Sequence, residues 1–96
     1  MGMSQNVECP QGVPEWPFIA GWLAERGFPV QIRMIDGQLA LPEEEPPANW
    51  NELRIGTSSG MVTIRRHPEG VELTIWGNAD ANLQKACDTI ALAFAN

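Results

Sequence analysis

The segment Gly56–Gly60 has the residue types of a serine-nucleophile motif. It reads GTSSG and matches the G-x-S-x-G pattern letter by letter. In hydrolases with this pattern the serine lies between a strand and a helix, and an acidic residue and then a histidine follow it in the chain. Here a strand-like segment follows, and the only histidine, His67, precedes Asp80 and Asp88. We therefore interpret the segment as a turn, and we predict no catalytic residues and no enzyme.

The sequence does not predict a metal or cofactor site either. His67 lies in a turn before a proline, with no cysteine or carboxylate at ligand spacing. Glu43, Glu44 and Glu45 form an acidic run, but calcium-binding loops alternate their oxygen ligands and include a glycine. Such a run is more typical of a solvated surface. We find no phosphate-binding loop, dinucleotide fingerprint or DNA-binding motif.

Composition limits the classes of function further. The chain has 96 residues, 44% of them hydrophobic, which suits one small globular domain rather than a disordered chain. Its formal net charge of −6 argues against nucleic-acid binding. No apolar run is long enough to cross a membrane, and the N-terminus lacks the features of a signal peptide. We therefore expect a cytoplasmic protein without nucleic-acid or membrane partners.

Two cysteines are too few for a disulfide framework. We expect Cys9 to be a reactive thiol in a flexible N-terminal tail. We expect Cys87 to lie on the apolar stripe of a helix, where it acts as a small hydrophobic residue. The two are predicted not to be bonded.

A β-hairpin is predicted for Met61–Trp76, because apolar and polar residues alternate on both sides of a turn at His67–Gly70. In the register that places Arg66 opposite Val71, the apolar residues share one face of the hairpin. That buried face carries Val62, Ile64, Val71, Leu73 and Ile75.

A second hairpin is predicted for Val30–Ile35 and Gln38–Leu41, around the strong two-residue turn Asp36-Gly37. Simple alternation gives it a buried face of Val30, Ile32, Met34, Leu39 and Leu41. It turns Ile35 to the opposite face.

The remaining segments complete the predicted order α-β-β-β-β-β-α. Five antiparallel strands with one apolar face need a cover, and two amphipathic helices provide it, so we predict an α+β two-layer sandwich with both helices on one face of the sheet. We expect a flexible tail over 1–13 and a single domain over 14–96. Within the domain, the remaining expected segments are a helix over Pro14–Arg26, a loop over Pro42–Asn51 with a helical turn at Pro47–Trp50, and a strand over Glu52–Thr57. The last helix is expected to begin at a cap formed by Asn78 or Asp80 and to carry the apolar stripe Leu83, Cys87, Ile90 and Phe94.

The opposite face of the sheet is the predicted site. Trp, Met and Arg are enriched at the cores of protein interfaces. By alternation, the residues that point outward and form the candidate partner-binding set are Arg33, Ile35, Arg54, Met61, Arg65 and Trp76. Two structural alternatives stay open: the tail or the Pro42–Asn51 loop covers Trp76, or Arg65 only pairs with Glu72.

These observations favour a small acidic protein-interaction module that binds a protein partner or a second copy of itself through the outer sheet face. One alternative is a small-ligand binder with a pocket between helices and sheet, although the inward residues offer no evident polar anchor. The order of elements also resembles, in outline, the small acidic secretion chaperones. These have a further helix between strands, which only Pro47–Trp50 could supply here, so an adaptor of that kind is a second alternative.

Overall fold

The computed structural model describes residues 2–41, 43–76 and 80–95. Six strands and two helices follow one another in this part of the chain, in the order β-α-β-β-β-β-β-α. Their bounds are β1 Met3–Glu8, α1 Trp16–Glu25, β2 Gln31–Ile35, β3 Gln38–Leu39, β4 Glu52–Thr57, β5 Gly60–His67, β6 Gly70–Ile75 and α2 Ala81–Ala95.

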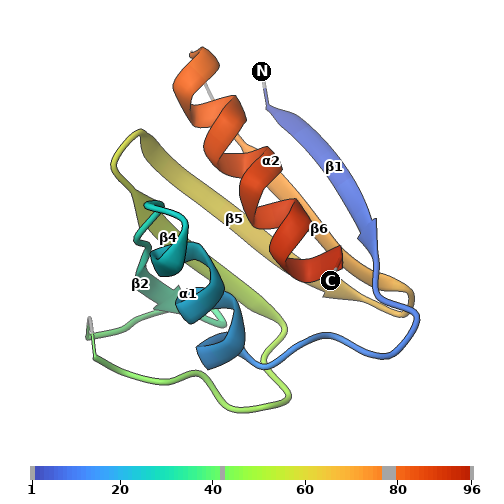
Figure 1. Cartoon of the computed structure of the whole chain (residues 1–96). Helices are drawn as coiled ribbons and strands as arrows, with labels where there is room; N and C mark the ends of the chain where they lie inside the picture. Colours follow the sequence, from blue (N-terminus) through green and yellow to red (C-terminus); the bar gives the residue numbers. More distant parts are fainter. Residues whose placement is uncertain (1, 42, 77–79, 96) are drawn as a thin grey trace.

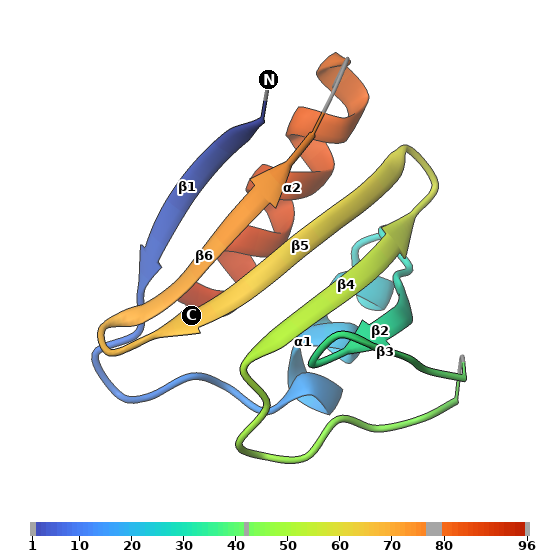
Figure 2. The ribbon, with the colours of Figure 1, turned by 180° about the vertical axis from the view of Figure 1, so that it is seen from behind.

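The strands form one antiparallel sheet with the spatial order β1-β6-β5-β4-β2-β3. Both helices cover the same face of this sheet, which we call the inner face (Figure 1). Neither described helix covers the opposite face, which we call the outer face (Figure 2). The predicted α+β fold, with an antiparallel sheet and a helix near each end of the chain, is confirmed, but the predicted number of five strands was wrong.

The additional strand is β1, which lies within the segment that we expected to be a tail. It pairs along its whole length with β6, from Met3 opposite Ile75 to Glu8 opposite Gly70. Gly70 allows this close pairing, because a side chain there would overlap the Val7 carbonyl oxygen and lie 2.9 Å from the Cys9 nitrogen. On the inner face, the Gln5 amide donates a hydrogen bond of 2.9 Å to Asp88 on α2.

The central hairpin has the predicted register. Ile64 faces Leu73, Arg66 faces Val71 and His67 faces Gly70 across β5 and β6. The five residues that were expected inside this hairpin are all buried. Alternation therefore placed these side chains correctly, because both strands are central in the sheet and one face of each is apolar.

The β2–β3 hairpin differs from its prediction. The pairing of β2 with β4 shifts between Ile32 and Met34, so that Ile32 faces Ile55 but Met34 faces Arg54. A bulge of this kind reverses the faces of the residues that follow it. Met34 consequently joins the outer face together with its partner on β3, Leu39, which is 87% exposed.

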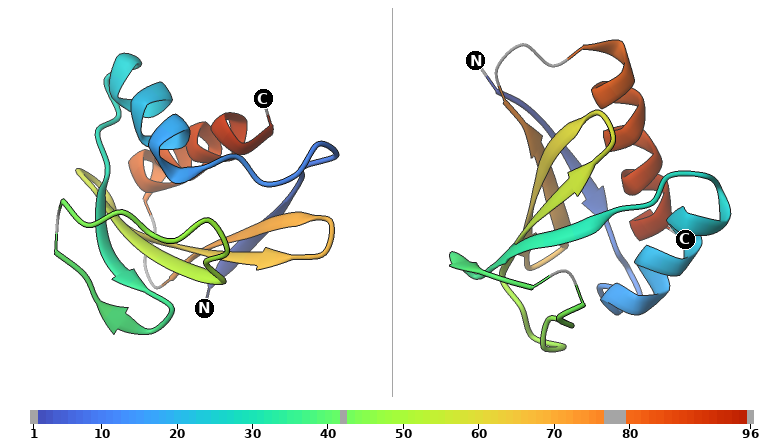
Figure 3. Two further views of the ribbon diagram at one scale, coloured as in Figure 1. Left: turned by 90° about the horizontal axis from the view of Figure 1, so that it is seen from below. Right: turned by 90° about the vertical axis from the view of Figure 1, so that its left-hand side faces the viewer.

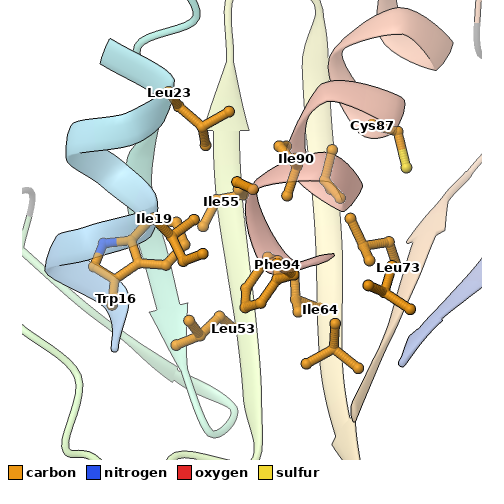
Figure 4. Packing of buried hydrophobic residues seen from close by; sticks show 14 of the residues in the cluster. Trp16, Ile19, Leu23, Leu53, Ile55, Ile64, Leu73, Cys87, Ile90 and Phe94 are labelled. Atoms are coloured by element: carbon orange, nitrogen blue, oxygen red, sulfur yellow. The ribbon is translucent and has the colours of Figure 1, made fainter. Parts of the chain in front are cut away.

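The two side views show the helix layer over one face of the sheet (Figure 3). One apolar core of buried side chains lies between these layers. Side chains from both helices meet those of β4, β5 and β6 (Figure 4). Full burial of a Leu, Ile or Phe side chain contributes about 1.5–3 kcal/mol to the free energy of unfolding. The labelled core residues in the close view are Trp16, Ile19, Leu23, Leu53, Ile55, Ile64, Leu73, Cys87, Ile90 and Phe94.

The helix ends follow from local sequence. Pro17 lies in the first turn of α1, where a missing N–H is tolerated, and Gly27 after its end has a φ of 79°. The nitrogen of Phe28 then closes the turn by donating to the Leu23 carbonyl at 2.9 Å. Asp80 caps α2 by accepting a 2.9 Å hydrogen bond from the Leu83 nitrogen. The other predicted cap, Asn78, lies outside the described residues.

The segment before β4 packs against the core through Trp50, which is buried edge-to-face on Phe94 at 6.5 Å. The Arg66 guanidinium lies 4.6 Å from the Trp50 ring centre and donates to the Ala48 carbonyl at 3.1 Å. The expected helical turn at Pro47–Trp50 is a single hydrogen-bonded turn and not a helix.

Candidate functional site

The outer face is built from cross-strand rows that the sheet register defines. The middle row runs across four strands, from Arg54 on β4 to Thr63 on β5, Thr74 on β6 and Ser4 on β1. The hydroxyls of Ser4 and Thr74 are 3.1 Å apart. On one side of the middle row lies a row with Glu52, Arg65, Glu72 and Asn6. On its other side lies a row with Gly56 and Met61, and Trp76 follows directly after the end of β6.

Trp76 and Met61 are the large apolar side chains at one end of this face. Trp76 is 61% exposed and Met61 is 44% exposed. The backbone of Gly2 lies against the Trp76 ring, since a Cβ there would come within 2.7 Å of it. The N-terminal strand therefore supports one side of the indole and leaves the larger part of it open.

Arg33 lies at the same end of the outer face, and Arg54 lies in the adjacent middle row. A Cβ on Gly56 would come within 3.0 Å of Arg33 Nε, so the Arg33 side chain extends over this glycine. Both arginines are exposed, and neither forms an ion pair with any residue that the structure describes. A positive and apolar region thus forms on a protein whose net charge is negative.

Arg65 has a different role from Arg33 and Arg54. Its Nε donates to the Glu52 carboxylate at 2.7 Å, and this hydrogen bond is the main cause that raises the pKa of Arg65, whereas burial lowers it. The predicted partner, Glu72, faces Arg65 across β5 and β6 but is not the residue that binds it. Glu52, Glu72 and Glu8 make this end of the outer face acidic.

Ile35 does not belong to the outer face. After the bulge in β2 it faces the buried Leu53, and it packs against the core. Its predicted outward orientation was wrong, because alternation was counted through the bulge. Met34 and Leu39 take the place that the sequence assigned to Ile35.

A shallow hollow of about 640 Å³ lies at the acidic end of the outer face. Its lining residues are Asn6, Glu8, Arg65, Arg66, His67, Glu69 and Glu72. His67 Nδ1 accepts a hydrogen bond from the Glu69 nitrogen at 3.1 Å. The Nε atom of Arg66 and the Nε2 atom of His67 are buried without a hydrogen-bond partner among the described residues.

The serine motif forms the turn between β4 and β5. Thr57 Oγ1 donates to the Gly60 carbonyl at 2.9 Å and accepts from the Ser59 nitrogen at 3.1 Å, so its hydroxyl closes the turn. His67 is the last residue of β5, and the whole length of that strand separates it from Ser58. The structure does not bring these two side chains together.

Both cysteines carry free thiols. Cys87 faces the sheet from α2, as predicted, whereas Cys9 is buried and donates to the Phe94 carbonyl at 3.5 Å. The expectation of a reactive Cys9 in a tail was wrong, because β1 holds this residue against the core. Burial raises the pKa of both thiols.

A small open pocket of about 240 Å³ lies between β1 and α2. Gln5 crosses it to Asp88, and the Cys87 thiol lies beneath at 3.4 Å from the Gln5 amide nitrogen. This pocket is smaller than the usual site for a drug-sized ligand. In the described ranges, no three His, Cys, Asp or Glu side chains gather as a metal ion would need.

Comparison of the chain with protein-family models, with curated proteins and with solved structures found no match. Neither of the two described helices is long and apolar enough to cross a membrane. Inference about function therefore depends on the surface of the chain itself.

Proposed function

We propose that this chain is a small cytosolic protein-interaction module that binds a protein partner through the outer face of its sheet. The observation that carries the proposal is the exposure of Trp76 and Met61 near Arg33 and Arg54, on a sheet face that neither described helix covers. Trp and Arg are the side chains most often found at binding hot spots. Scattered single apolar side chains need no partner, but here they lie next to two arginines that form no ion pair in the described part of the chain.

The shape and charge of this end favour a partner that is acidic and partly apolar. The arginines supply charge-assisted hydrogen bonds to carboxylates, and the indole supplies a rigid apolar contact. The β2–β3 hairpin projects on the side of the sheet away from the helices (Figure 3). Its Leu39 is 87% exposed. An acidic partner would gain contacts from the hairpin as well as from the sheet.

The first test asks whether Trp76→Ala weakens association. Loss of a central Trp typically costs about 2 kcal/mol or more, which is about thirtyfold in affinity. Phe18→Ala is the matched control, because Phe18 is also aromatic and half exposed but lies on α1 in the helix layer. Sedimentation of the wild type and both variants over a concentration series measures self-association, and circular dichroism checks the fold.

The second test covers a partner other than the chain itself. A photo-crosslinking residue is placed at position 61 or, as control, at position 18, in the cells that produce the protein. A product that forms from position 61, is absent from position 18 and is lost with Arg54→Glu supports the proposal. Equal crosslinking from both positions, or none from position 61, contradicts it.

A further inference from the structure

The free edge of β1 is the second surface that the structure leaves open. β1 is the terminal strand of the sheet, so one side of its backbone has no neighbouring strand in the described part of the chain. The opposite edge is formed by β3, which is only two residues long. Natural proteins protect long edge strands with proline, lysine or bulges, yet Met3–Glu8 contains none of these.

The register identifies the backbone groups that point outward from this edge. Cys9 donates to the Glu69 carbonyl at 2.9 Å, so Cys9 and every second residue before it direct their backbone towards β6. Ser4, Asn6 and Glu8 therefore direct their N–H and C=O groups away from the sheet. Their side chains lie on the outer face, since Ser4 contacts Thr74 there.

We propose that this edge pairs with the β1 edge of a second copy of the chain, antiparallel and centred on Asn6, to make one continuous sheet. In this register Asn6 faces Asn6 of the second copy and Ser4 faces Glu8. Each facing pair of outward residues exchanges both main-chain hydrogen bonds. On the inner face, Gln5 faces Val7 and Met3 faces Cys9.

Charge favours this register over one centred on Glu8, so the strand can pair with a second copy of itself. Glu8 is the only charged residue of β1, and in the register centred on Asn6 it faces a neutral serine. A register centred on Glu8 would place two carboxylates directly opposite each other, which is destabilising. Met3, which is exposed at this edge, gains an apolar neighbour in the paired sheet.

A proline at position 6 tests the pairing with little effect on the fold. Because the Asn6 N–H points away from β6, Asn6→Pro removes an intermolecular donor from each copy and none of the bonds within the sheet. We expect the dimer dissociation constant, measured by sedimentation equilibrium, to rise about tenfold or more. Asn6→Ala keeps the backbone N–H and is the matched control, which should retain the dimer.

Cysteine crosslinking tests the register directly. In the proposed pair the two Cα atoms at position 6 are about 5.5 Å apart, which suits a disulfide. The two Cα atoms at position 8 are about 14 Å apart, which is too far. Under mild oxidation Asn6→Cys should therefore form a covalent dimer and Glu8→Cys should not, while the native thiols stay buried.

A wild type that stays monomeric at all concentrations, or equal crosslinking from positions 6 and 8, would overturn edge pairing. The outcome is independent of the outer-face proposal, because Trp76 is not among the residues that pair in the proposed register. A dimer that Trp76→Ala weakens and Asn6→Pro does not would assign self-association to the outer face, and the edge proposal would fail. The reverse result would support pairing at the β1 edge.

Discussion

At the scale of single residues, strand alternation decides which side chains are in the core and which are on the outer face. Ile64 and Leu73 face each other and are fully buried. Their neighbours Thr63 and Thr74 point to the outer face and are still largely covered by surrounding side chains. A polar centre therefore separates the Trp76 end of the outer face from its acidic end.

Leu73→Ala should reduce the free energy of unfolding by about 2–5 kcal/mol, because it opens a cavity at a fully buried position. Leu39→Ala is the matched control and should change it by less than about 0.5 kcal/mol, because Leu39 is 87% exposed. Urea unfolding followed by Trp fluorescence measures both. Equal effects of the two substitutions would show that the register of the central hairpin is wrong.

At the scale of secondary-structure elements, the sequence predicted those that have their own periodicity. The central hairpin and the stripe of α2 were predicted because their apolar residues repeat at the strand and helix spacings. β1 was missed because Val7 is its only buried residue and its other inward residues include the polar Gln5. Its strand conformation is imposed by pairing with β6, which no local pattern reports.

The candidate site was predicted in part for the same reason. Arg54, Met61 and Arg65 lie on the face that alternation assigned to them, because alternation holds along β4 and β5. Arg33, before the bulge in β2, also extends over this face at Gly56. Ile35 was not, because the bulge in β2 depends on how β2 pairs with β4. The sequence of β2 carries no glycine or other residue that would indicate a bulge.

The attachment of β1 should depend on Gly70. Gly70→Ala places a methyl group against the backbone of Val7 and Cys9, which cannot rotate away as a side chain can. We expect faster hydrogen exchange of the β1 amides that bond to β6, and exposure of the Cys9 thiol to labelling reagents. Gly21→Ala is the control, because nothing lies within 4 Å of its Cβ position and it should stabilise α1 by about 1 kcal/mol. Unchanged exchange in Gly70→Ala would contradict this account of β1.

At the scale of the whole molecule, two free thiols are enclosed by the one core. Cys87 packs between α2 and the sheet, and Cys9 lies where β1 passes the end of α2. Burial disfavours the thiolate and raises the pKa of each above the ordinary value of 9.0. At Cys87 the hydrogen bond from Gln5 lowers the pKa and the Asp88 charge raises it, and at Cys9 the Arg66 charge opposes the shift.

Stability should therefore fall as the pH rises above about 9. In the unfolded chain the thiols lose their protons near their ordinary pKa, while in the folded protein they keep them to higher pH. The unfolded state then binds fewer protons than the folded state, and the free energy of unfolding decreases with pH. Below the unfolded pKa both states are protonated, so these thiols add no pH dependence there. Urea unfolding between pH 7.5 and pH 10 measures the effect.

The double substitution Cys9→Ala/Cys87→Ala isolates the contribution of the thiols. It lowers stability at every pH through lost packing, so the comparison uses the slope of stability against pH and not its absolute value. We expect a shallower fall between pH 9 and pH 10 in the double variant than in the wild type. Equal slopes in the wild type and the double variant would mean that the thiols ionise at the same pH in the folded and the unfolded protein. That result is incompatible with the burial of Cys9 beside the end of α2 and of Cys87 between α2 and the sheet.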